Sequence, residues 1–423
     1  MRGAFGGVMK AAIFPGWWQV AVAITIQAVY SAAIYSGYSV VAMPLQHAFQ
    51  PSRVVLMLGI TVTSLVGGAL TPFLGAAMDR YSLRIIMLIG ASLLPAGFLA
   101  LSFATSMTYV VSVYAIFMAV ASVLLGPVAS SALLARWFTR RRGLAMGIAA
   151  AGSTLGSLIL PPLLQGLIDH FDWRTAFRIF AGILFAIAVP VIAFVAVNRP
   201  SDRNLFPDGD GPPSEASAEF GQGHFRTTIS VLRDPNFWFI SVILGLVLSS
   251  ASAVGSNLLP IAIGKGITAD RGALLISVLS AGAFTGKMVF AGVGDRIDLR
   301  LLLAIAMLVL ATGMLGFLQA DGYAMLVAAT LLTGLSGGTV VPLWGYLLAR
   351  AFGPENIGRV MGLMNFVVLP VTIGAPPLFG WVYDKTGSYN NAFILYMALL
   401  PALAIVLLPR IRTQPATPAT KAA

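Results

Sequence analysis

Twelve long apolar segments follow one another along this chain, and a helix needs roughly 20 apolar residues to cross a lipid bilayer. We expect spans at about 17–45, 54–78, 84–104, 108–134, 143–167, 175–197, 236–262, 272–294, 299–319, 322–348, 357–382 and 390–409. Only 10% of the residues are charged, which is too few to cover the surface of a water-soluble protein of this length. A membrane β-barrel would show short alternating segments instead. The sequence therefore predicts an all-α membrane protein.

The chain repeats itself at a nearly constant offset. LLARWF (133–138) returns as LLARAF (347–352), and DRYSLR (79–84) returns as DRIDLR (295–300). The repeat predicts two pseudo-symmetric six-helix halves, 1–197 and 234–410. We expect the segment 198–233, rich in Pro, Gly, Ser and acids, to be a mobile cytoplasmic linker, and 411–423 to be a disordered tail. Repeated halves are typical of alternating-access carriers, which bind substrate between them near the bilayer midplane.

Basic residues are distributed unevenly between alternate loops. With both termini in the cytoplasm, 19 lysines and arginines lie on the inside and 6 on the outside, and one, Lys287, lies within a span. Because cytoplasmic loops are enriched in Lys and Arg, this predicts a multi-pass protein of the cell inner membrane with both termini inside. The same loop charge accounts for the net charge of +11, so no nucleic-acid partner is expected.

Enzymatic chemistry is not expected. The chain has no cysteine, and its three histidines lie in predicted loops, so it offers no catalytic pair, no metal cluster and no cofactor site. A substrate sensor on a carrier scaffold would need an appended signalling domain, and the linker and tail are too short for one. We expect a monomer that contacts membrane lipids.

The stretch GAAMDRYSLR (75–84) resembles the loop 2–3 signature of the major facilitator superfamily. The matching residues are Gly75, Asp79, Arg80 and Arg84, and the second copy, AGVGDRIDLR (291–300), keeps Asp295, Arg296 and Arg300. The family fold implied is a twelve-helix carrier. The two aspartates can accept hydrogen bonds from helix N-termini and from arginines across the cytoplasmic side. We therefore expect gating by Asp79, Arg80, Arg84, Asp295, Arg296 and Arg300, against the plainer interpretation that the arginines only anchor the topology.

A narrower resemblance follows in WFTRRRGLAMGIAAAGSTLG (137–156), which is similar to the loop 4–5 signature of monocarboxylate transporters. PGWWQV (15–20) resembles the opening of span one in bacterial members of that group and in the related oxalate–formate exchangers. Small residues at 147, 151, 152 and 156 have helical spacing, so we expect this face of span five to pack closely on another span. The Gly-Pro signature of drug antiporters is missing from span five.

Lys287 is the only full charge predicted inside the membrane, because all fifteen acids lie in loops or at span ends. Its burial without a partner would cost at least about 2.5–3.5 kcal/mol, so we expect it to face a water-filled cavity and to attract an anion. The family resemblance agrees, since related carriers place a basic residue, often arginine, at this position. Their aspartate one turn earlier is replaced by Ala283, and their span-one lysine is absent.

Other polar side chains in apolar spans are candidates for substrate binding or for helix–helix contacts: Tyr30, Tyr38, Asn257, Trp344 and Asn365. The function expected is secondary active transport of a small organic anion, monocarboxylate-like, by alternating access. The alternative is proton-coupled efflux of lipophilic drugs or metabolites. The resemblance implies symport, but coupling through Lys287 itself, exchange against a counter-anion and uncoupled transport all stay open.

Overall fold

The computed structural model describes residues 14–209 and 226–412, and these residues are helical almost throughout. Twelve of the described helical segments are long and apolar enough to cross a membrane, as the sequence predicted. The N-terminal spans are α1 (Gly16–Tyr30) continuing into α2 (Tyr38–Phe49), α3 (Arg53–Arg80), α4 (Leu83–Leu101), α5 to α7 (Met107–Trp137), α8 (Arg142–His170) and α9 (Trp173–Val195). The C-terminal spans are α12 (Pro235–Gly264), α13 (Ala269–Val293), α14 (Leu299–Gln319), α15 (Tyr323–Phe352), α16 (Ile357–Thr386) and α17 (Asn390–Leu407).

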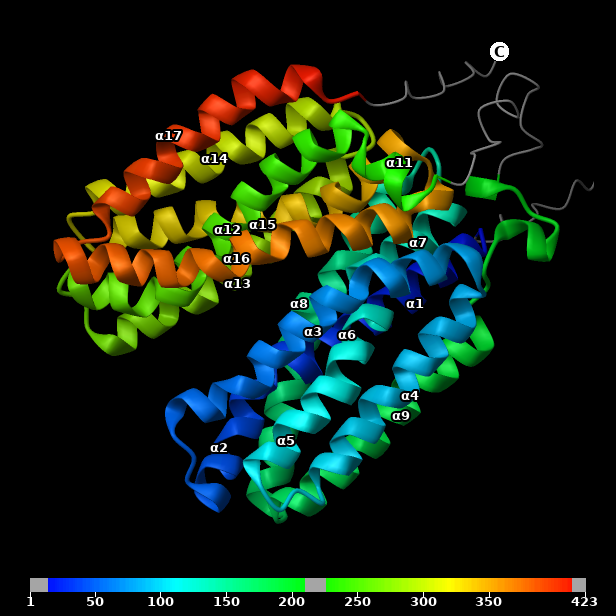
Figure 1. Cartoon of the computed structure of the whole chain (residues 1–423), viewed down its shortest axis with the longest axis horizontal. Coiled ribbons are helices and arrows are strands. Elements are labelled where there is room, and N and C mark those ends of the chain that lie inside the picture. The colour runs from blue at the N-terminus through cyan, green and yellow to red at the C-terminus, as the bar shows by residue number, and fades with distance from the viewer. Residues whose placement is uncertain (1–13, 210–225, 413–423) are drawn as a thin grey trace, which may run out of the picture.

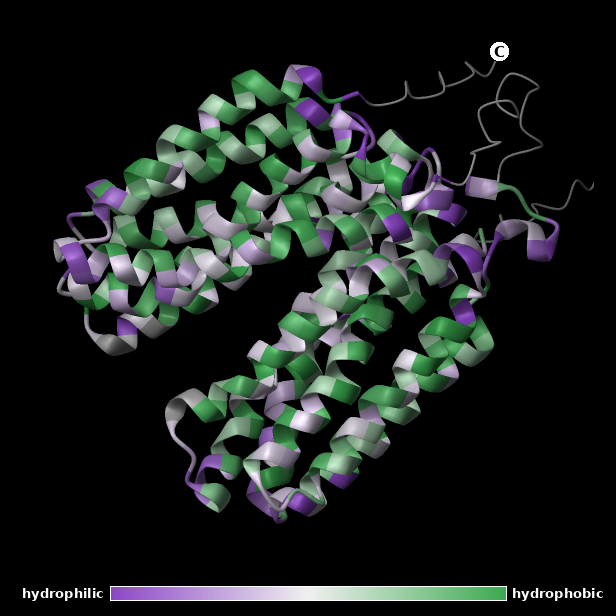
Figure 2. Ribbon diagram, viewed as in Figure 1, coloured by the Kyte–Doolittle hydropathy of each residue, from purple (hydrophilic) through white to green (hydrophobic). Residues whose placement is uncertain are grey.

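Polar caps decide where many of these helices begin. The first amide groups of a helix have no intrahelical partner, so a serine or aspartate that accepts from them stabilises the start. Such caps precede α3, α4, α5, α9, α12 and α14, and they are Ser52, Ser82, Ser106, Asp172, Asp234 and Asp298. Figure 2 shows the corresponding hydropathy, with polar residues gathered at the helix ends and apolar residues along the helix lengths.

Spans one and four are interrupted by π-helical turns. In span one the interruption is η1 (Ser31–Ser36), and in span four it is η2 (Tyr114–Met118), which lies between α5 (Met107–Val113) and α6 (Ala119–Leu125). A further break follows at Gly126, where Pro127 begins α7 (Pro127–Trp137). π-turns of this kind occur frequently at functional sites.

The helices form two bundles, with α1 to α9 in one and α12 to α17 in the other (Figure 1). The bundles converge at the end where the described chain begins and ends and where the linker runs, and they splay apart toward the other end (Figure 1). We call these the linker end and the far end. Contacts between the bundles are made mainly by α3 with α16 and by α8 with α13. A binding site shared by the two bundles would therefore lie between these helix pairs.

Both described ends of the linker are held against the bundles. The first part contains two short 3-10 turns, η3 (Pro200–Arg203) and η4 (Pro207–Gly209), and the last part contains the helix α11 (Thr228–Leu232). Carboxylate and amide side chains bond these parts to residues just before α8 and α16, and a mobile linker over 198–233 stays a prediction. The middle, 210–225, and the tail from 413 lie outside the described residues. Ile411 is buried and Arg412 is bonded to Asn236, and the disordered tail over 411–423 stays a prediction.

Candidate functional site

Asp79 joins the two bundles at the linker end. Its carboxylate lies in the last turn of α3 and is 5% exposed. It accepts hydrogen bonds from the amides of Gly358 (2.9 Å) and Arg359 (2.8 Å), in the first turn of α16. Amides in the first turn of a helix are unpaired and carry a partial positive charge, so a carboxylate is their natural acceptor. We call this contact the Asp79 clamp.

Asp295 makes the matching contact in the opposite sense. It follows α13 in the C-terminal bundle and accepts from the amides of Gly143 (2.6 Å) and Leu144 (2.9 Å), in the first turn of α8. Burial raises the pKa of Asp295 above its ordinary value, and the bonds from these amides oppose that shift. The two clamps reproduce the sequence repeat as a pair of pseudo-symmetric bonds between carboxylates and helix N-termini. The prediction that both aspartates meet helix N-termini agrees with this geometry.

Close packing of small residues brings the clamped helices together. A methyl group built on Gly358 would overlap the carbonyl oxygen of Gly75 on α3, and one built on Gly147 would lie 2.6 Å from the Cβ atom of Ala291 on α13. Gly152 and Gly156 contact the backbone of α1 in the same way, at Ile24 and at Ala28. The small-residue face of α8 therefore packs on both α13 and α1, as its spacing predicted.

Four arginines were predicted to take part in gating with the two aspartates, and two of them bond within their own bundles. Arg84 donates to the carbonyl of Ala193 within the N-terminal bundle. Arg300 pairs with Asp298 at 3.1 Å within the C-terminal one. Arg80 and Arg296 are exposed. In this conformation the two aspartates bond across the bundles to helix amides, and a gating role for the four arginines remains a prediction.

Lys287 lies on α13, deeper than the clamps, and faces the other bundle. Its Nζ atom donates to Ser153 Oγ at 2.7 Å and to Thr154 Oγ1 at 2.8 Å, both on α8. The residue is 7% exposed, so these two hydroxyl oxygens stand in for water around the ammonium. No acid appears among the partners described for it. The sequence pointed to an anion-seeking lysine but missed Ser153 and Thr154, although both lie within the loop 4–5 signature.

A cavity of about 330 Å³ lies between the two bundles. Half of the lining residues carry a hydroxyl or amide group, and these are Tyr30, Tyr35, Thr63, Ser64, Thr71, Ser122, Ser252, Asn365 and Thr372. The cavity thus includes two of the predicted candidates, Tyr30 and Asn365. Lys287 is not part of the described lining. In this conformation Lys287 bonds to α8, where small residues allow close contact with α13, and the water-filled cavity expected beside the lysine stays a prediction.

The other candidates make contacts inside one bundle. Tyr38 is buried and its hydroxyl donates to the carbonyl of Leu56. Asn257 donates to the carbonyls of Ala253 and Pro376. Trp344 is buried, and its indole nitrogen lies 3.2 Å from the sulfur of Met364. In this conformation all three contact residues of their own bundle, and a role for them in substrate binding stays a prediction.

A larger hollow of about 590 Å³ lies at the far end of the N-terminal bundle. It is lined by residues of α2, α8, α9 and the turn between the last two, among them His47, Gln165, Asp172 and Trp173. Since one rigid bundle supplies the whole lining, a rotation of the bundles against each other would not change its exposure. The cavity between the bundles is the better candidate for a transport site.

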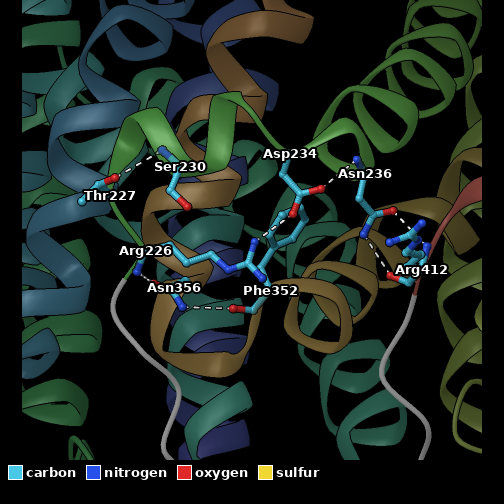
Figure 3. A network of polar contacts seen from close by, with 8 residues as sticks. All are labelled: Arg226, Thr227, Ser230, Asp234, Asn236, Phe352, Asn356 and Arg412. Atoms are coloured by element: carbon cyan, nitrogen blue, oxygen red, sulfur yellow. Dashed lines mark hydrogen bonds and ion pairs between the residues drawn. The ribbon is translucent and has the colours of Figure 1, made fainter.

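The linker contacts both clamped helices. Asp208, whose φ of +60° lies in the left-handed region, accepts from the amides of Thr139 (2.8 Å) and Arg140 (2.6 Å), just before α8. At the other end of the linker, the amide of Arg226 donates at 2.8 Å to Asn356, the residue directly before α16 (Figure 3). The Arg226 guanidinium pairs with Asp234 at 2.8 Å. The guanidinium of Arg359 donates to the carbonyl of Arg226. Both ends of the linker are thus attached next to a clamp.

Comparisons with known proteins agree with this arrangement. The sequence profile of the Major Facilitator Superfamily matches residues 23–281 and 246–423. Monocarboxylate transporter 13 of Bos taurus is 27% identical over 405 residues, which cover 93% of this chain and 89% of the relative. Monocarboxylate transporter 12 of Xenopus laevis is 26% identical over 332 residues, or 75% of this chain and 72% of the relative. Among solved structures, that of the human organic anion transporter MFSD10 is similar with a TM-score of 0.73 at 16% identity, covering 93% of this chain and all of that one.

Proposed function

Because this chain belongs to the major facilitator superfamily, we propose that it carries a small organic anion of the monocarboxylate type across the membrane by alternating access. It is a secondary transporter related to the monocarboxylate transporters, and its nature as a carrier rather than an enzyme follows from the family. What we propose beyond the family is the chemical class of the substrate, a small organic anion.

The observation that carries the proposal is the burial of Lys287 together with its hydrogen-bond partners. The ammonium is buried between the bundles, and its described partners are two neutral hydroxyls. A positive charge in such surroundings attracts an anion, because a carboxylate supplies both hydrogen-bond acceptors and the opposite charge. The names of the relatives indicate the same chemical class.

Orientation and location complete the proposal. The excess of basic residues in alternate loops favours a cytoplasmic linker end, and hence an outward-open conformation with the far end exposed. In a bacterial cell this membrane is the inner membrane. The hydroxyl-rich lining of the cavity suits a polar solute, and it weakens the alternative of lipophilic drug efflux.

Uptake into proteoliposomes tests the proposed function. A thermal-shift panel of short carboxylic acids first selects the anion that stabilises the purified protein most. Uptake of that anion is expected to be lost in Lys287→Ala and partly kept in Lys287→Arg, which retains the charge. Lys265→Ala is the matched control, because Lys265 lies at the far end and donates to the carbonyl of Ala320. Undiminished uptake by a folded Lys287→Ala protein would rule out the proposed role of Lys287.

A further inference from the structure

In the described part of the chain, Asp79, Asp295 and Lys287 make hydrogen bonds between the bundles, and the lysine differs from the two aspartates. Asp79 and Asp295 bind backbone amides at the linker end, where glycines leave no room for a solute. Lys287 instead binds side-chain hydroxyls, eight residues before Asp295 on α13. At 1.5 Å per residue this is about 12 Å deeper. Of the three contacts, the lysine contact is thus the one farthest from the closed end.

From this we propose that Ser153 and Thr154 are the resting partners of the Lys287 ammonium, and that an entering anion helps to open the linker end by taking the ammonium away from them. The inference rests on the proposed function, since it requires an anionic substrate. It adds two positioning residues and a reason why binding and conformational change are coupled.

Competition between the two kinds of partner follows from their charges. A hydroxyl offers the ammonium a lone pair, whereas a carboxylate offers lone pairs together with a full negative charge. In a site shielded from water the carboxylate is therefore the preferred partner. The exchange removes both hydrogen bonds between α13 and α8 at this level, and so weakens the contact that keeps the bundles together. A ligand changes a conformational equilibrium only through such differential contacts.

The chain provides a matched control one helical turn away. Ser157, also on α8, bonds to Ser31 at 3.0 Å and to Ser36 at 2.6 Å, both in its own bundle. Its removal deletes hydroxyl contacts of the same kind without touching the junction between the bundles. Ser157→Ala should therefore leave the opening of the linker end unchanged.

A single cysteine can report the opening, because the natural chain has none. Ser131 on α7 is 9% exposed, and a methyl group built on Gly345 of α15 would lie 2.9 Å from its Cβ atom. It therefore lies at the junction of the bundles. In Ser131→Cys protein, reconstituted in nanodiscs, the rate of maleimide labelling measures how often this junction opens.

The test combines the reporter with four backgrounds and three probes, acetate, lactate and pyruvate. Labelling should accelerate by at least about tenfold in Ser153→Ala/Thr154→Val, because this variant loses both hydrogen bonds to the ammonium and the loss of one alone corresponds to about tenfold. It should stay slow in Ser153→Thr/Thr154→Ser and in Ser157→Ala. A transported probe should accelerate labelling in the parent, and it should cause little further acceleration in the Ala/Val variant. If that double variant does not fold, each single substitution should give part of the acceleration.

Two results would overturn the inference. The first is labelling as slow in the folded Ala/Val variant as in the parent, which would mean that the hydroxyls do not hold the junction. The second is a probe that is taken up by the parent in proteoliposomes but does not accelerate its labelling, which would remove the trigger and leave the proposed transport intact. Absence of uptake for every carboxylate would instead reject the proposed function, and this inference with it.

Discussion

Replacing Asp79 by asparagine should favour opening of the linker end by about 2–3 kcal/mol. The carboxylate accepts two amide bonds, at 2.9 and 2.8 Å, from the N-terminus of α16. The amide oxygen of asparagine can keep one of them, but its NH₂ group cannot accept the other. A lost bond to a buried charge is worth roughly 1.5–3 kcal/mol, and the remaining bond weakens because it is no longer charge-assisted.

This free energy corresponds to an increase of about 30- to 150-fold in the equilibrium constant for opening. The cysteine reporter at position 131 measures it as a faster rate of maleimide labelling. Asp295→Asn should have a smaller effect, because Asp295 is only partly buried and solvent screens its contact. The two clamps share no partner, so the effects of the double variant should add.

Labelling that stays slow in a folded Asp79→Asn protein would refute the reasoning, since it would mean that the clamp does not limit opening. A larger effect of Asp295→Asn than of Asp79→Asn would also contradict it, because the order follows from burial. Thermal melting of each variant separates a local opening from a general loss of stability.

Two further predictions concern the same end of the molecule. Gly147→Ala should cost roughly 1–3 kcal/mol by overpacking against α13 and should lower the melting temperature, whereas Gly292→Ala, with nothing within 4 Å of its added methyl group, should not. Asp208→Ala should make the linker more sensitive to limited proteolysis, because the amides before α8 lose their acceptor; unchanged digestion would contradict this.

Some parts of this structure could be predicted from the sequence, because they depend on local properties of the chain. Hydrophobic segments of membrane length identify the spans whatever their neighbours are, and most helices extend a few residues beyond the predicted apolar ranges. The repeat of DRYSLR as DRIDLR indicated that the two aspartates occupy equivalent places. A lysine with no acid nearby could be recognised as unusual from its position alone.

The tertiary structure decided which residues meet. Helical periodicity tells which side chains share a face, but neither the rotation of that face nor the helix opposite to it. It could not show that Lys287 meets Ser153 and Thr154, or that Tyr30 lines the cavity while Tyr38 packs inside a bundle. These contacts depend on how closely helices from distant parts of the chain approach one another, and small residues on both partners set that approach.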